Sequence, residues 1–292
     1  MYYYSLNEYL KNTFGEKVYK ISLDGGMTCP NRDGKIDTRG CIFCSRGGSG
    51  EFSADRNHNI TEQIREAKER IGRKTDCKKF IAYFQPFTNT YAPVEYLEKI
   101  FTEAIAPDEI AALSVATRPD CLPDEVIGLL SSLNKIKPVW VELGLQTAHQ
   151  STADYIRRGY PLSVYDDAVM RLHKEGISVI THIIIGLPNE IDDMIIESAR
   201  YAGECSDGIK LQLLHILKGT DLCDEYYKGN VSVLSLEKYT EILVKCLQAI
   251  PKTTVIHRLT GDGDKNILVA PMWSADKKRV LNYINKAIRE SE

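Results

Sequence analysis

The stretch CPNRDGKIDTRGCIFC, residues 29–44, places three cysteines near the start of the chain: Cys29, Cys41 and Cys44. A structural zinc ion takes four protein ligands, typically from two close pairs. The sequence contains no second CxxC pair and no HxxxH pair. Three thiolates instead suit an iron-sulfur cluster that keeps one iron open for a small molecule. We therefore interpret the stretch as a catalytic cluster loop, although half of a zinc site or a redox dithiol gives the same CxxC string.

Glycine and proline explain how these cysteines can meet. Gly34 and Gly40 allow the long first gap to run as a loop, and Pro30 keeps Cys29 out of a helix interior. The three sulfurs can therefore converge from one loop. The other cysteines are scattered singletons that we interpret as reduced thiols, mostly in the core: Cys77, Cys121, Cys205, Cys223 and Cys246.

Composition sets broad limits. The chain has 292 residues, 43% hydrophobic and 26% charged, which suits a globular protein of one or two domains. The net charge is -3 and the pI is near 6.1, so only a local basic patch could bind nucleic acid. No apolar run approaches the length of a membrane span, and MYYYSLNEYL does not have the pattern of a signal peptide. We expect a cytoplasmic protein without a membrane partner.

Strand-like and helix-like segments alternate along the chain. The predicted strands are residues 18–24, 79–84, 109–117, 139–146, 177–186 and 208–217, and the predicted helices are 61–74, 94–105, 123–133, 163–176 and 192–204. This repeat predicts an α/β fold with a parallel sheet, best accommodated as a partial (β/α)6 barrel with ligands at the C-terminal strand ends. A doubly wound open sheet is the alternative. We expect residues 1–220 to form the barrel core and 221–292 a C-terminal extension that packs on it.

Polar residues share one face of the fourth predicted strand, VWVELGLQ. Its two-residue period puts Trp140, Glu142, Gly144 and Gln146 on one side and the aliphatic residues on the other. One interpretation is a buried Glu142 paired with a neighbouring arginine for stability. The other is a hydrogen-bonding wall for a polar ligand.

Further motifs follow in order along the strand ends: ATRPDCL (116–122), ELGLQT (142–147), IRRGY (156–160), IIIGLP (183–188) and LKGT (217–220). With the cysteine loop, this series resembles the radical S-adenosylmethionine (SAM) superfamily, in the branch of the elongator catalytic subunit, coproporphyrinogen dehydrogenase and bacterial tRNA-modifying proteins. Their order is far more specific than any single match.

The resemblance implies cofactors and a reaction. Cys29, Cys41 and Cys44 would ligate three irons of a [4Fe-4S] cluster, and SAM would chelate the open iron through its amino and carboxylate groups. One electron from the cluster would cleave the sulfonium, giving methionine and a 5'-deoxyadenosyl radical that takes hydrogen from the substrate.

It also implies cofactor contacts. Gln146 would contact the ribose, and Arg158, with Arg157 as the second choice, would bind the methionine carboxylate. Gly186 and Leu187 would pass their backbone against the adenine. Glu142 is expected near the amino group or in the substrate cavity. The Gly-Gly-Glu segment that binds the amino group in many members is replaced by FQPFTNTYA (84–92). The remaining predicted contacts are Gln85 or Asn89 from that segment, Arg118 and Lys218.

Substrate information lies in the last part of the chain. VIHRLTGDG (255–263) and LVAPMWSADKKRVLNYINKAIRE (268–290) resemble the tail of a bacterial subgroup associated with the wobble-uridine side chain of tRNA. The implied reaction converts a carboxymethylaminomethyl group to an aminomethyl group. His257 and Arg258 would act on the substrate, and Lys277, Lys278 and Arg279 would hold the RNA backbone. A short KKR run can equally be a solvated helix face.

The expected partners are tRNA, a flavodoxin or ferredoxin-type electron donor and a methyltransferase that acts next. Two rival functions remain open. One is a radical oxidase of tetrapyrroles or other small molecules, and the other is a non-catalytic zinc-binding RNA adaptor. His182 and His215 lie in apolar strands, and we interpret both as core histidines rather than ligands.

Overall fold

The computed structural model describes residues 3–73 and 77–291. Ten of the described segments are strands: β1 (Tyr4–Ser5), β2 (Val18–Leu23), β3 (Lys79–Phe84), β4 (Ile110–Thr117), β5 (Val139–Gln146), β6 (Ser178–Ile185), β7 (Gly208–Leu213), β8 (Ile216–Leu217), β9 (Val255–Arg258) and β10 (Leu268–Ala270). The α-helices are α1 (Leu6–Phe14), α2 (Ile60–Gly72), α3 (Val94–Ile105), α4 (Asp124–Asn134), α5 (Gln150–Tyr155), α6 (Leu162–Lys174), α7 (Asp192–Cys205), α8 (Asp221–Tyr227), α9 (Leu236–Ala249) and α10 (Lys277–Glu290).

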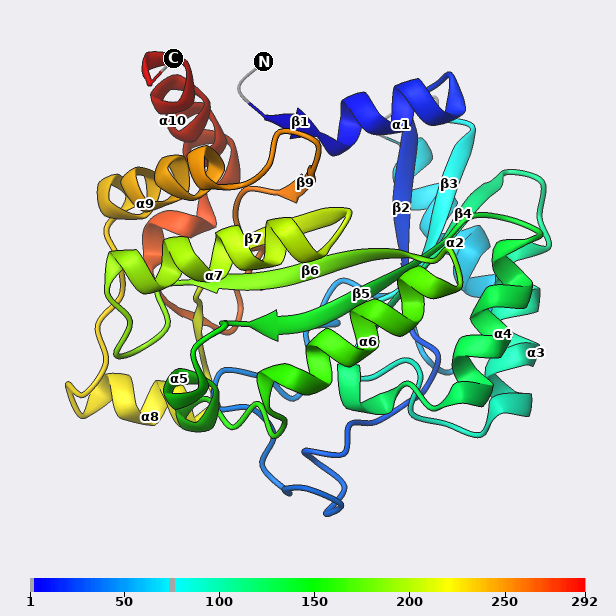
Figure 1. Ribbon diagram of the computed structural model, residues 1–292, viewed down its shortest axis with the longest axis horizontal. Coiled ribbons are helices and arrows are strands. Elements are labelled where there is room, and N and C mark those ends of the chain that lie inside the picture. Colours follow the sequence, from blue (N-terminus) through cyan, green and yellow to red (C-terminus); the bar gives the residue numbers. More distant parts are fainter. Residues whose placement is uncertain (1–2, 74–76, 292) are drawn as a thin grey trace.

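The main sheet is parallel throughout and has the order β1-β9-β7-β6-β5-β4-β3-β2. Strands β2 to β7 are neighbours in their chain order, and the sheet curls into a half-barrel (Figure 1). This confirms the predicted partial barrel. A doubly wound sheet would reverse its strand order at a switch point, and the order here does not reverse between β2 and β7.

Two features of the sheet differ from the prediction. The segment 208–217 is not one strand, because β7 ends at Leu213 and β8 turns away to pair antiparallel with β10. The other difference is that β9 and β1 extend the sheet beyond β7. Both are short, and segments of two to four residues carry too little periodicity to be recognised in a sequence.

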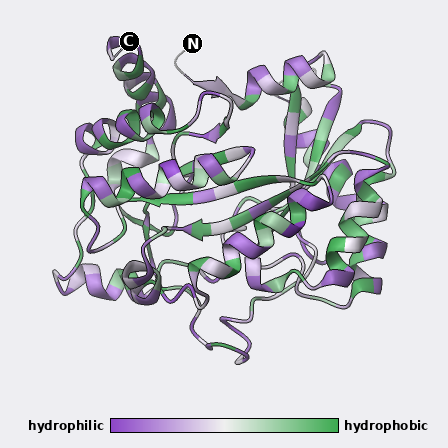
Figure 2. Ribbon diagram, viewed as in Figure 1, coloured by the Kyte–Doolittle hydropathy of each residue, from purple (hydrophilic) through white to green (hydrophobic). Residues whose placement is uncertain are grey.

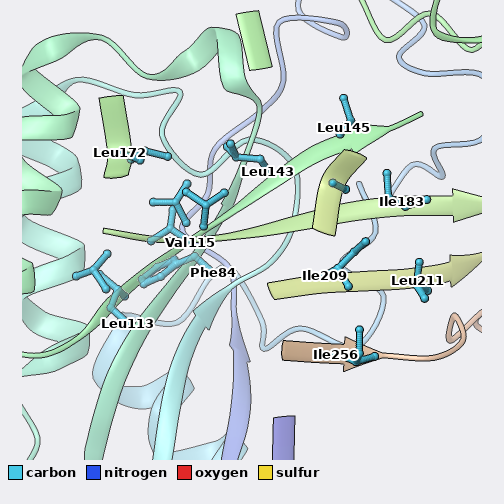
Figure 3. Close-up of a cluster of buried hydrophobic side chains, with 14 of the residues drawn as sticks. Phe84, Leu113, Val115, Leu143, Leu145, Leu172, Ile183, Ile209, Leu211 and Ile256 are labelled. Carbon is cyan, nitrogen blue, oxygen red and sulfur yellow. The ribbon is translucent and has the colours of Figure 1, made fainter. Parts of the chain in front are cut away.

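The outer face of the half-barrel holds the main hydrophobic core. Helices α2, α3, α4, α6 and α7 pack on the strands there, and Figure 2 shows hydrophilic and hydrophobic residues alternating along the covering helices. Hydrophobic side chains from β2 to β7 and from β9 gather on this face, including Leu143, Ile183 and Ile256 (Figure 3). Each fully buried Leu or Ile contributes about 1.5–3 kcal/mol, so this layer dominates the stability of the fold.

The inner face changes character along the strands. Near the strand starts, Val18, Ile81 and Trp140 pack with Leu10 of α1 and close that end of the half-barrel. Nearer the C-terminal ends, the inward positions are polar. The predicted alternation in β5 is confirmed, because Trp140 and Glu142 face inward while Val139, Val141, Leu143 and Leu145 belong to the outer core.

The last part of the chain is integrated into the barrel. Strand β9 pairs with β7, α9 packs on α7, and α10 packs on α9. The Tyr239 hydroxyl in α9 donates to the Leu259 carbonyl at 2.7 Å, which fixes the segment after β9. Among the helices that the structure describes, none has the length and apolar character needed to cross a membrane.

Candidate active site

A cavity of about 410 Å³ lies inside the half-barrel at the C-terminal ends of the strands. All three cysteines of the loop after β2 line it. The sheet contributes side chains to the same cavity from successive strands, among them Tyr83, Gln85, Arg118, Glu142, Gln146, His182, Lys210 and Arg258. Ligands of parallel barrels bind at this end, so the cavity is the candidate active site.

Hydrogen bonds within the cysteine loop fix its shape. The Cys44 amide donates to the Cys41 carbonyl at 3.0 Å, and the Arg32 guanidinium donates to the carbonyls of Cys44 and Ser45 at 2.8 and 2.6 Å. Gly40 has a φ of 78°, and a Cβ there would lie 3.0 Å from the Arg32 side chain. Glycine is therefore needed between the first two cysteines, as predicted for a loop.

The three cysteines suit a multi-iron cluster. Among residues 3–73 and 77–291, no three His, Cys, Asp or Glu side chains converge closely enough to chelate one metal ion. A four-iron cluster does not need this, because each thiolate binds a different iron. Burial, with a contribution from Cys44, raises the pKa of Cys41 to about 12, and burial also raises the pKa of Cys44. The thiolate forms therefore require a compensating cation such as iron.

Glu142 is the centre of a buried polar network below the cysteine loop. One carboxylate oxygen accepts from Lys20 and, at 2.7 Å, from the Ser114 hydroxyl. The other accepts from Lys210 and, at 2.8 Å, pairs with His182. The side chain of Glu142 is fully buried, and four donors share its single charge.

Electrostatics in this network follow from burial. Burial opposes ionisation of Glu142, but the two lysines and His182 hold its pKa well below the usual value. Burial lowers the pKa of Lys210 to about 7 and that of His182 to about 4, although Glu142 opposes both shifts. Glu142 is therefore ionised and His182 neutral near neutral pH.

Some predicted contacts line the cavity in a form that suits a ligand. Gln146 has a φ of 68°, and its side-chain amide oxygen Oε1 has no hydrogen-bond partner among the described residues. An acceptor in this state suits a ligand hydroxyl. Gln85 accepts from the Ser22 hydroxyl at 2.7 Å and donates to the Ser49 carbonyl at 2.6 Å, so it fastens the GGSG loop (47–50) beside the cavity.

Arg158 lines the cavity, but its donors are committed to other groups of the protein. Its guanidinium donates to the carbonyls of Leu145, Thr147 and Tyr160 and to the Gln150 side chain, which uses all five N–H groups. In this arrangement Arg158 has no donor for a cofactor carboxylate. It clamps the loop after β5 instead.

The alternative arginines are also paired. Arg157 forms an ion pair with Asp221 at 2.6 Å. Arg118 lies over the Tyr160 ring and forms a bidentate pair with Asp120, with distances of 2.9 and 2.7 Å. Of these arginines, Arg118 faces the cavity beside the cysteines and keeps donors beyond this pair, so it is better placed for an anionic cofactor group than Arg158.

Five predicted residues are not brought into the cavity. Asn89 is buried between strand ends, where it donates to the carbonyls of Phe84 and Ala116. Leu187 packs in a separate hydrophobic cluster, and Gly186 beside it faces Leu234. Lys218 is exposed and donates to the Asn266 carbonyl at 3.2 Å.

His257 is the fifth. It stacks edge-on against Trp140 with ring centroids 5.7 Å apart and lines a different cavity, at the starts of the strands. An irregularity in the β7–β9 pairing causes this, because Arg258 rather than His257 pairs with Lys210. Arg258 alone of the two therefore lines the main cavity.

Five side chains in or beside the cavity were not predicted as site residues. Lys20, Tyr83 and Lys210 were not singled out, and His182 and His215 were interpreted as core histidines. The two lysines could have been predicted from the sequence, because a lysine inside an otherwise apolar strand must find a buried anion or a ligand. His215 also lines the cavity, with Nε2 3.1 Å from the Ser274 hydroxyl.

Comparisons with known proteins agree with this geometry. Residues 38–202 match the radical SAM superfamily, and residues 206–290 match the radical SAM C-terminal domain. Uncharacterized protein YtqA of Bacillus subtilis is 46% identical over 287 residues, covering 98% of this chain and 89% of that protein. Protein YhcC of Escherichia coli is 35% identical over 283 residues, covering 96% and 90%.

A solved structure supports the fold. The archaeal Methanocaldococcus infernus Elp3 aligns with a TM-score of 0.66 at 18% identity, covering 92% of this chain and 63% of that one. The family matches, the barrel and the shared cavity of the three cysteines lead to one assignment. The chain belongs to the radical S-adenosylmethionine superfamily and is an enzyme of this group, which uses a [4Fe-4S] cluster and S-adenosylmethionine.

Proposed function

We propose that this enzyme acts on the wobble uridine of tRNA and converts its carboxymethylaminomethyl side chain to an aminomethyl group. The observation that carries the proposal is the position of a basic helix start beside the cavity. Lys277, Lys278 and Arg279 are exposed at the start of α10. Lys277 pairs with Asp262 at 2.5 Å, and Asp262 lines the cavity.

Helix stability does not explain three cations at this place. The N-terminal turn of a helix carries partial positive charge, so each lysine or arginine there is unfavourable by a few tenths of a kcal/mol or more. Phosphate groups are the natural partners of such a turn. A nucleic acid held here would have its modified base within reach of the cavity, which supports an RNA substrate despite the acidic pI.

The chemistry of the side chain fits hydrogen abstraction. Bound SAM and cluster supply a 5'-deoxyadenosyl radical in this superfamily. The hydrogen atom would leave the methylene between the amine and the carboxylate, because both groups stabilise a radical there. Loss of one further electron to a flavodoxin or ferredoxin-type carrier, and of the N–H proton, would give an imine. Water would then release the aminomethyl nucleoside and glyoxylate, so the oxidation removes two electrons in total.

The product has a free amine, so a methyltransferase is a suitable next enzyme. The zinc-binding adaptor suggested as an alternative by the cysteine spacing is set aside, because the chain belongs to an enzyme superfamily.

Nucleoside analysis tests the proposal. Bulk tRNA from cells with and without the gene is digested, and the wobble nucleosides are separated and weighed by mass spectrometry. We expect the carboxymethylaminomethyl form to accumulate without the gene, and the purified, cluster-loaded enzyme to convert it in vitro. Cys41→Ala should abolish conversion, and Cys205→Ala is the matched control. Identical nucleosides in both strains, with no binding of tRNA at low salt, would point to a small-molecule substrate.

A further inference from the structure

Basic side chains outnumber carboxylates at the inner end of the cavity. Lys210 and Arg258 line the cavity, and Lys20 shares Glu142 with Lys210; we call these three residues the cationic floor. Each lysine hydrogen-bonds to Glu142, and Arg258 is close enough to lower the pKa of both lysines. Within the described part of the chain, Glu142 is the only carboxylate in contact with either lysine.

Glu142 cannot supply the missing charge. Its two oxygens already accept from Lys20, Ser114, Lys210 and His182. One carboxylate therefore serves both lysine amines, and among the described residues Arg258 forms no ion pair with it. A buried cation without a matching anion is costly, so the floor favours an anionic ligand.

Arg258 is the group with unused donors. Its side chain is 34% exposed, and its nearest carboxylate, Asp262, is 3.9 Å away, which is too far for a hydrogen bond. Asp262 is instead held by Lys277 at 2.5 Å. Among the described residues, no hydrogen bond engages the guanidinium. Its planar group is therefore free to bind both oxygens of a carboxylate.

The cationic floor is separate from the cysteine end of the cavity. Lys20 lies three residues before the end of β2, and Lys210 three residues before the end of β7, whereas the cysteines follow β2 in a loop. The cations near the cysteines have their own partners: Arg32 binds loop carbonyls and Arg118 binds Asp120. An anion on the floor would therefore lie deeper than the cluster site.

We propose that Arg258 and Lys210 bind the carboxylate of the substrate side chain on this floor and so select a carboxymethylated substrate. The identity of that side chain rests on the proposed function. A phosphate of the RNA backbone is a poorer candidate, because a polymer cannot thread to the inner end of a cavity of about 410 Å³. A carboxylate at the tip of a flexible side chain reaches it, and the adjacent methylene then faces the cysteine end.

Chemical modification tests the site without tRNA. The full-length, cluster-loaded enzyme is treated with phenylglyoxal, and modification of Arg258 is followed by peptide mass spectrometry. N-methylglycine should slow this modification by about tenfold at saturation, as expected for a charged bidentate pair, and N-methylglycinamide should not. Arg171, a partly exposed arginine on α6, is the internal control and should react equally with either compound. Equal modification of Arg258 with both compounds would overturn the site.

A second experiment measures how tightly the enzyme binds the modified nucleoside. 5-Carboxymethylaminomethyluridine should bind about tenfold more tightly than its amide, and Arg258→Gln should remove this preference while Arg258→Lys retains part of it. Conversion of tRNA with full preference in Arg258→Gln would refute the floor and leave the proposed function standing. Selective protection of Arg258 by N-methylglycine, with tRNA nucleosides unchanged by the gene, would refute the tRNA function and leave the carboxylate site standing.

Discussion

Lys20 and Glu142 form an ion pair across the hollow of the half-barrel, joining β2 to β5 although β3 and β4 lie between them in the sheet. The pair can form only because the sheet curls and brings non-neighbouring strands face to face. The polar network is therefore a consequence of the barrel, and it also links the two sides of the sheet around the cavity.

Removing the carboxylate should destabilise the fold. Glu142→Gln leaves Lys20 and Lys210 buried without their counter-charge, and we expect the free energy of unfolding to fall by about 3–5 kcal/mol. Urea unfolding of the purified chain measures this. Glu241→Gln, in an exposed ion pair on α9, is the matched control and should change little. An equally stable Glu142→Gln protein would mean that water already solvates the lysines.

Stability should also depend on the protonation of Lys210. Its pKa is about 7 in the fold, mainly because of burial, and near 10.4 in an unfolded chain. Between these values the unfolded state holds a proton that the folded state lacks, so stability rises with pH. The loss of stability caused by burying the protonated Lys210 amine is fully present below about pH 7. It disappears as the pH rises toward 10.4.

Charged and polar groups face Lys210 from five neighbouring strands, so the wild type is compared with a variant that lacks only the Lys210 amine. Glu142 and His182 contact or face it from β5 and β6, Lys20 and Tyr83 from β2 and β3, and Arg258 from β9. We expect the wild-type unfolding free energy to rise more steeply than that of Lys210→Met, by up to about 1.4 kcal/mol per pH unit between about pH 7 and 9. Parallel pH profiles for the two proteins would show that Lys210 stays protonated.

Arg158 is expected to act on the loop rather than on the cofactor. Arg158→Ala removes the guanidinium donors from the carbonyls of Leu145, Thr147 and Tyr160, and the unfolding free energy should fall by about 3 kcal/mol or more. Arg171→Ala, which removes a partly exposed ion-pair arginine, is the control. If Arg158→Ala unfolds like wild type but loses affinity for SAM in titration, the carboxylate contact predicted from the sequence is right instead.

If Cys29, Cys41 and Cys44 are the cluster ligands, only these cysteines should be needed to hold iron. Replacing Cys29, Cys41 or Cys44 by Ala should eliminate the cluster, because a missing thiolate is not replaced by another protein group. Cys205→Ala should keep its iron. Iron and sulfide content after anaerobic reconstitution decides this, and a Cys121 variant as deficient as Cys41→Ala would revise the ligand set, since Cys121 is buried near Cys29.

Local sequence patterns were sufficient to predict the barrel, but they predicted the site only in part. Six apolar runs with intervening helices predicted the parallel strands, and the period of two in β5 placed Glu142 inward. The partners of Glu142 could not be predicted, because Lys20 and Lys210 meet it only through the curl of the sheet. The backbone direction after β6 is likewise a tertiary property, and it turns Gly186 and Leu187 away from the cavity.

The basic start of α10 is predicted to bind the RNA backbone. Replacing Lys278 and Arg279 together by Ala should weaken tRNA binding and flatten its dependence on salt, because each lost phosphate contact lowers the slope of log K against log salt by about 0.7–0.9. Lys286→Ala with Arg289→Ala, on the same helix but away from its start, is the matched control. SAM cleavage without substrate should be unchanged in both, because neither pair lines the cavity. Equal salt dependence in wild type and in the Lys278 and Arg279 variant would show that these cations are only a solvated helix face.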